Sequence, residues 1–137
     1  MRPPASAGAP SVVVLDTHVL IHDALAPARL SRRAKRLLDT QPLACSDISL
    51  WEVGMLVSKG RVAIEADTEQ FLEDIIRARN LRVLPITPRI AALAQSPEFS
   101  HADPADRIIA ATAIAHRARL LSADERLRRL GSVEVVW

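Results

Sequence analysis

A nearly unbroken apolar helix in the last third of the chain places the tightest limit on how this sequence can fold. Residues 108–115, with the sequence IIAATAIA, contain no charged side chain and only one hydroxyl group, that of Thr112. A helix without a polar face packs between other elements rather than on a surface. Just before it, Asp103 can cap the helix, Pro104 suits its first position, and Asp106 falls in its first turn. The pattern predicts a buried helix whose entrance carries two carboxylates.

Short apolar runs alternate with amphipathic segments along the rest of the chain. Strands are expected at residues 11–15, 42–45, 81–84, 120–121 and 133–136. Helices are expected after Asp16, over 30–40, from a capping box at Ser49–Glu52 to Lys59–Gly60, over 67–79, over 87–94, and from a cap at Ser122 to Gly131. This alternation predicts an α/β fold with a mostly parallel sheet of about five strands, covered by helices on both faces.

Length and composition are typical of one globular domain. The chain has 137 residues, of which 49% are hydrophobic and 25% charged. We expect a domain over residues 11–137, preceded by a disordered proline-rich lead-in at residues 1–10. The lone Cys45 cannot form an internal disulfide and suggests a reduced core thiol in a cytoplasmic protein. No apolar run reaches the ~18–20 residues of a membrane span.

Charge alone does not select a partner. The net charge is only +2, although basic residues crowd two segments, 29–36 and 117–129. Such clusters are either solvated helix faces or contacts for phosphate groups.

Four acids follow the expected strand ends or open the apolar helix: Asp16, Glu52, Asp106 and Asp124. The carboxyl ends of parallel strands meet at one edge of a sheet, where open α/β folds bind ligands. Each acid also has a structural explanation: an N-cap at Asp16 or Thr17, the box with Ser49, or a first-turn position. If they converge, each pair at ~4 Å repels by ~1 kcal/mol in water and ~4 kcal/mol at an effective dielectric of 20.

A divalent cation would offset that repulsion. Oxygen ligands favour Mg²⁺, with Mn²⁺ as a substitute. Zinc is disfavoured because Cys45 stands alone and the histidines lack ligand spacing.

Four segments in this order resemble the signature of PIN-domain ribonucleases, in particular the VapC toxins of type II toxin–antitoxin systems: Val14–Leu20, Ser46–Val53, Asp103–Ala111 and Leu121–Asp124. The resemblance spans roughly residues 12–137 and implies a PIN-like three-layer α/β/α sandwich. It also implies that the same four acids are the catalytic, metal-binding residues, with Asp103 as an outer-shell helper. The segment 95–101 is shorter than is common in that family, which would alter the rim of the site.

The resemblance implies a metal-dependent endoribonuclease that hydrolyses RNA phosphodiester bonds with a Mg²⁺-activated water. It further implies an RNA substrate, a cognate antitoxin over the acidic cleft and a homodimer. The alternative is a catalytically inert PIN-like domain that binds a protein partner or RNA. A phosphotransfer enzyme with Asp16 as nucleophile is disfavoured, because His18 occupies the position where many such enzymes carry a second acid.

Supporting roles stay open for three further residues. Thr17 and Ser122 adjoin expected ligands and either cap helices or bind a metal-bound water or a phosphate. Arg107 either contacts the scissile phosphate or pairs with Asp103. The histidines at 18, 22, 101 and 116 are expected to be structural. Trp51 is expected in the core or at an interface.

Overall fold

Five short strands form one parallel sheet in the order β3-β2-β1-β4-β5. The strands are β1 (Val13–Leu15), β2 (Leu43–Ser46), β3 (Arg82–Leu84), β4 (Arg119–Leu121) and β5 (Val135–Val136). The structure is a computed structural model that describes residues 12–100 and 103–137, so the expected lead-in, Ser11 and His101 lie outside it. The predicted parallel sheet of about five strands is confirmed.

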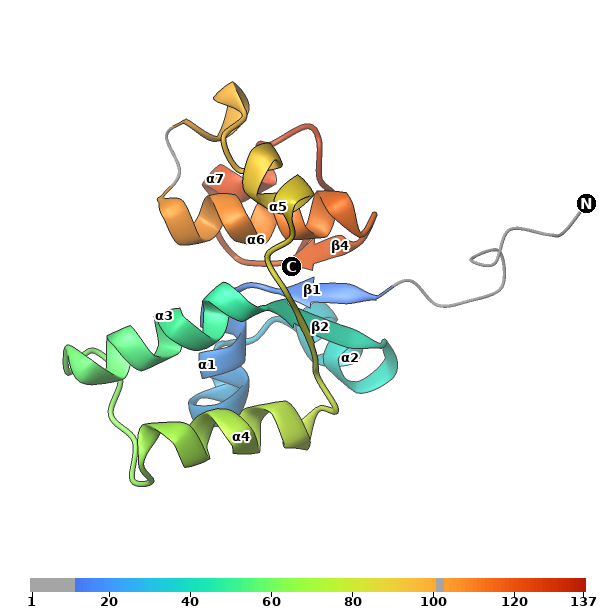
Figure 1. The fold of residues 1–137 in the computed structure, drawn as a ribbon. Helices are drawn as coiled ribbons and strands as arrows, with labels where there is room; N and C mark the ends of the chain where they lie inside the picture. The colour runs from blue at the N-terminus through green and yellow to red at the C-terminus, as the bar shows by residue number, and fades with distance from the viewer. Residues whose placement is uncertain (1–11, 101–102) are drawn as a thin grey trace, which may run out of the picture.

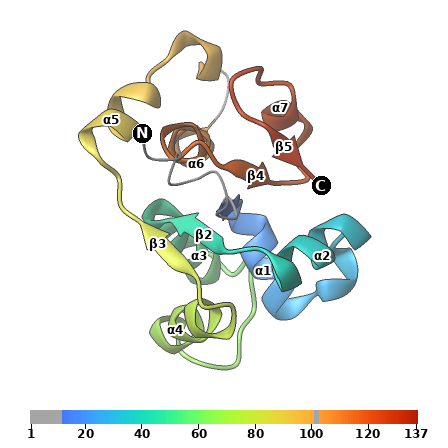
Figure 2. The ribbon, with the colours of Figure 1, turned by 90° about the vertical axis from the view of Figure 1, so that its right-hand side faces the viewer.

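Helices cover both faces of the sheet (Figures 1 and 2). One layer contains α1 (Thr17–Leu25), α2 (Arg32–Thr40), α3 (Asp47–Ser58) and α4 (Thr68–Ala78). The other contains α5 (Pro88–Leu93), α6 (Pro104–Ala115) and α7 (Glu125–Arg128). Two 3-10 turns, η1 (Pro27–Arg29) and η2 (Pro97–Phe99), lie in the connections. The arrangement is the expected three-layer α/β/α sandwich.

Strand β1 supplies core residues to both layers. Val13 and Leu15 pack with α1, α2 and α3 on one side, whereas Val14 packs with α6 on the other. Successive side chains of a strand point to opposite faces, so a three-residue strand in the middle of the sheet can be buried completely. This explains the unbroken apolar sequence that predicts β1.

Helix α6 is buried as its sequence predicts. Ala110 and Ala113 pack against Leu120 of the sheet, and Ala111 packs against Ile90 of α5 (Figure 1). Small side chains on both sides let the helix backbone lie close to its neighbours.

Two helices begin at residues other than those predicted. The capping box of Ser49 with Glu52 is wrong: α3 begins at Asp47, and its N-cap is Ser46, whose hydroxyl accepts a hydrogen bond from the N–H of Ile48 at 3.2 Å. The physical reason is that β2 runs directly into α3, so the serine that ends the strand also caps the helix. Gly60, with φ of +72°, follows the helix end as expected.

The predicted cap at Ser122 is also wrong. The N-cap of α7 is Asp124, which accepts a hydrogen bond from the N–H of Arg126 at 2.8 Å. The Ser122 hydroxyl is instead directed to Asp16.

Two expectations about burial have different outcomes. Cys45 is fully buried in the core, and burial raises the pKa of its thiol to about 12. Trp51 is 62% exposed, so of its two expected positions the core is wrong, whereas a position at an interface stays a prediction.

Among the described residues, no helix is both long enough and apolar enough to cross a membrane.

The packing of α6 predicts a sharp difference between two alanine sites. Ala110→Leu adds bulk between α6 and the sheet and is expected to lower the free energy of unfolding by about 1–3 kcal/mol. Ala92→Leu makes the same change at an exposed position of α5 and is expected to stay within about 0.5 kcal/mol of wild type. Urea unfolding measures both, and equal losses would contradict the described burial of α6.

Candidate functional site

The register of the sheet brings the ends of β1 and β4 together. Leu15 pairs with Leu121, so the next residues, Asp16 and Ser122, lie opposite each other just beyond the ends of the two strands. The Ser122 hydroxyl donates a hydrogen bond of 2.7 Å to Asp16 Oδ2 and accepts one of 3.0 Å from the N–H of Asp124. Asp16 is only 5% exposed and makes no side-chain capping bond to α1. Asp16 occupies the N-cap position of α1, but its carboxylate is held by a side chain 106 residues away and not by a capping bond.

A cavity of about 360 Å³ lies at this edge of the sheet. Its lining contains all four acids expected to bind metal, together with the expected helper: Asp16, Glu52, Asp103, Asp106 and Asp124. These residues come from the segment after β1, from α3, from the start of α6 and from the segment after β4. The structure thus gathers acids that are far apart in the sequence around one hollow.

Glu52 reaches the cavity from α3 without the serine partner that the sequence suggested. Ser49 instead accepts a hydrogen bond of 3.0 Å from the buried hydroxyl of Thr17, which joins α1 to α3. Thr17 does not line the cavity. Glu52 Oε1 is buried and has no hydrogen-bond partner among the described residues. A buried carboxylate oxygen without a partner is costly unless a ligand supplies one.

The start of α6 carries the second pair of acids as predicted. Asp103 is the N-cap and accepts a hydrogen bond of 2.9 Å from the N–H of Asp106, with Pro104 at the first position. Arg107 does not line the cavity, and within the described part of the chain it forms no ion pair with Asp103. Its buried Nε has no partner there.

Burial and mutual repulsion raise the pKa values of three of these carboxyls. For Asp106, burial is the largest cause and the charges of Asp103 and Asp16 follow, so its pKa rises to about 8. Burial also raises the pKa of Asp16 and that of Glu52. In the metal-free protein at neutral pH, Asp106 is therefore largely protonated.

The donor set fits a hard divalent cation. The lining has five carboxylates, while its only arginine, Arg126, is 3.4 Å from Asp124. Oxygen donors whose pKa values are raised by burial and then by neighbouring negative charge are suited to Mg²⁺ or Mn²⁺. The side chains are not already closed around one point, since no group of three or more His, Cys, Asp or Glu among residues 12–100 and 103–137 is arranged to hold a metal ion.

The cavity is lined by six further residues that the sequence analysis did not assign to it: His18, Val19, His22, Ala123, Arg126 and Trp137. The sequence could have placed the two histidines at the cavity, because side chains four residues apart share a helix face and α1 begins directly after Asp16. Trp137 could not be placed in this way, since its position depends on how the last strand joins the sheet.

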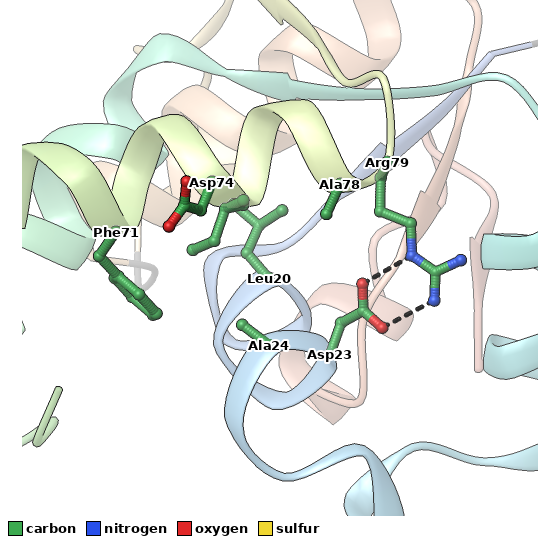
Figure 3. A pocket seen from close by; sticks show the side chains of 8 residues that line it. Leu20, Asp23, Ala24, Phe71, Asp74, Ala78 and Arg79 are labelled. Carbon is green, nitrogen blue, oxygen red and sulfur yellow. Dashed lines mark hydrogen bonds and ion pairs between the residues drawn. The ribbon is translucent and has the colours of Figure 1, made fainter. Parts of the chain in front are cut away.

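A second and larger cavity, of about 520 Å³, lies between α1 and α4 (Figure 3). Figure 3 shows the Asp23 carboxylate facing the Arg79 guanidinium, with two hydrogen bonds of 2.9 Å, near Leu20 and Ala24. Arg79 also binds Asp39 at 2.8 Å. The guanidinium of Arg79 is thus paired with the carboxylates of Asp23 and Asp39. We therefore interpret this cavity as a structural ion-pair site rather than a catalytic one.

Comparison with known proteins agrees with this geometry. The family model described as PIN domain matches residues 13–133, and the chain belongs to the PIN domain family. Over 120 residues it is 37% identical to "Ribonuclease VapC22" of Mycobacterium tuberculosis, an alignment that covers 86% of this chain and 91% of that protein.

Solved structures share the fold. The chain resembles one in the structure of VapBC2 from Rickettsia felis bound to a promoter DNA fragment, with a TM-score of 0.69, 21% identity, and coverage of 91% of this chain and 97% of that one. It also resembles one in DNA-bound VapBC from Salmonella typhimurium, with a TM-score of 0.68, 18% identity, and coverage of 92% and 97%.

The raised pKa of Asp106 predicts a pH-dependent stability in the metal-free protein. The folded-state pKa of about 8 exceeds the ordinary value of 3.8, so the folded state binds more protons than the unfolded state between these values. The free energy of unfolding therefore decreases as pH rises towards and through 8. Asp106→Asn removes the charge and is expected to make the protein more stable than wild type at pH 8.5 in EDTA, by roughly 1 kcal/mol after allowance for solvent screening.

Urea unfolding at pH 5.5 and 8.5 measures this difference. Asp74→Asn, at an exposed acid of α4, is the control and should leave the pH dependence unchanged. An Asp106→Asn protein that loses stability with pH as steeply as wild type would show that Asp106 is not the group responsible.

Proposed function

We propose that this protein is a metal-dependent endoribonuclease and the toxin component of a toxin–antitoxin pair. The observation that carries the proposal is the gathering of five acids in one cavity, three of them with raised pKa values. Capping alone does not account for that arrangement, because the side chain of Asp16, the N-cap residue of α1, makes no capping hydrogen bond, and Glu52 lies inside α3. The 37% identity to a protein named as a ribonuclease supports RNA as the substrate.

In this proposal Asp16, Glu52, Asp106 and Asp124 bind Mg²⁺, with Mn²⁺ as a substitute, and Asp103 acts from the outer shell. When bound, such a cation lowers the pKa of a water and neutralises charge that builds up on the phosphate. Ser122 positions Asp16 through the 2.7 Å hydrogen bond. Thr17 supports the site indirectly by fixing α1 to α3.

A cognate antitoxin that covers the acidic cavity is the expected partner, and a homodimer is the expected assembly. The two structures compared above are described as VapBC bound to DNA. The competing function is an inert domain of the same fold that binds RNA or a protein without cleaving it.

RNA cleavage tests the catalytic proposal directly. Purified protein should cut total cellular RNA into discrete fragments in Mg²⁺ or Mn²⁺ and should not do so in EDTA. Asp16→Asn and Asp106→Asn each remove one negative ligand and are expected to lower the cleavage rate about 100-fold or more. Asp74→Asn is the matched control, because this acid lies on α4 outside the acidic cavity, and it should cleave at the wild-type rate.

Circular dichroism must show that the variants are folded. Folded wild-type protein that never cleaves RNA with either metal would favour the inert domain.

Metal binding can be measured without any RNA. A cation that binds only the folded state stabilises it by RT ln(1 + [L]/Kd), which is about 1.4 kcal/mol at ten times Kd. Mn²⁺ and Mg²⁺ are therefore expected to raise the melting temperature of wild type and of Asp74→Asn. The increase should disappear in the Asp16→Asn/Glu52→Gln double variant. An equal increase in that variant would place the cation elsewhere.

A further inference from the structure

A third cavity, of about 440 Å³, adjoins the acidic one. It lies between α1, η1, the last turns of α3 and the connection from α3 to α4, in the lower layer of Figure 1. His18 and His22 line both cavities, so the two hollows share a wall on α1. The centroids of these two imidazole rings are 6.3 Å apart. A chain molecule leaving the acidic cavity over α1 would enter this second one.

The charge of this third cavity is opposite to that of the acidic site. Arg29 and Arg61 lie on its rim, and none of its lining residues is acidic. Both arginines are exposed, and neither forms an ion pair within residues 12–100 and 103–137. The two guanidinium groups are thus available to a phosphate, for which their planar donor arrangement is well suited.

The floor of the cavity is apolar. Ile21, Leu56 and Val62 line it, and Leu25 lies beside them with 45% of its surface exposed. An apolar floor with cationic groups at its rim matches the chemistry of a nucleotide, which has a flat base and a charged phosphate.

We propose that this cavity binds the nucleotide next to the scissile phosphate, with its phosphate at Arg29 and Arg61 and its base over the apolar floor. The ligand class is single-stranded RNA, because an unpaired base can enter a pocket without the cost of unstacking and unpairing that a base in a duplex must meet. This inference rests on the proposed ribonuclease function, since it extends the path of the same substrate. Its role is to hold a polyanion that the neighbouring carboxylates would otherwise repel.

RNA binding tests the proposal without requiring cleavage. The Kd of a short fluorescent single-stranded oligoribonucleotide is measured by anisotropy in EDTA at several salt concentrations. Arg29→Ala/Arg61→Ala is expected to weaken binding about tenfold and to reduce the slope of log K against log salt by about 0.7, since the two arginines bind one phosphate and each phosphate neutralised on a single strand contributes ~0.7. Arg33→Ala/Arg36→Ala removes the same charge from exposed positions of α2 outside both cavities and should change the slope little.

The apolar floor gives a second, independent readout. Leu25→Ala removes an exposed contact that carries no charge, so it should weaken binding severalfold and leave the salt slope unchanged. Equal losses in the two double variants, or wild-type affinity after Arg29→Ala/Arg61→Ala, would overturn the proposal. A protein that binds RNA through the two arginines but never cleaves it would refute the catalytic function and retain the nucleotide pocket.

Discussion

Negative charge held away from water at the carboxyl ends of β1 and β4 is the constraint on which the rest of this structure depends. Two unit charges ~4 Å apart repel by about 4 kcal/mol at an effective dielectric of 20, and burial adds a desolvation cost. The fold relieves the metal-free site by the hydrogen bond from Ser122 to Asp16 and by the raised pKa of Asp106. Such a site lowers the free energy of unfolding unless a cation occupies it. Cation binding therefore explains these acids better than a structural role does.

The register of the parallel strands fixes where the acids of this cluster lie. Asp16 and Ser122 are held at one level because Leu15 pairs with Leu121 in the middle of the sheet. On the other face, α6 can bring its acidic N-terminus to the same edge because residues such as Ala110 are small enough for close packing on the strands. A change in that packing would therefore shift Asp106 as well as reduce stability, so the core of this protein also sets the geometry of its site.

Most of the fold could be predicted from the sequence, because its elements are encoded by local patterns: the apolar β1, the capped α6 and the glycine after α3. The same local patterns gave a wrong prediction where two serines could each have been the N-cap of one helix. Ser46 and Ser49 both precede the apolar stretch of α3, and only the direct passage from β2 into the helix decides between them. Three of the four acids could be identified through their positions after strands, and Asp106 through its position at the start of the apolar helix. The bond from Ser122 to Asp16, in contrast, spans 106 residues and has no local signature. The pocket at Arg29 and Arg61 could not be predicted either, because it depends on how residues 18–29 pack against residues 56–63.

The contrast between the two adjoining cavities follows from the electrostatics of any enzyme that cuts a polyanion with carboxylates. Five acids around one hollow repel RNA at a distance, and a cation bound among them compensates only part of that charge. Attraction must therefore come from outside the acidic cavity, within about a Debye length, ~8 Å at physiological salt, beyond which screening removes it. His18 and His22 line both cavities, so the positive charge of Arg29 and Arg61 lies in a cavity that adjoins the acidic one, and neither arginine lines the acidic cavity itself. Separate cavities of opposite charge thus allow one small domain to attract a polyanion without pairing the acids of the acidic cavity with arginines.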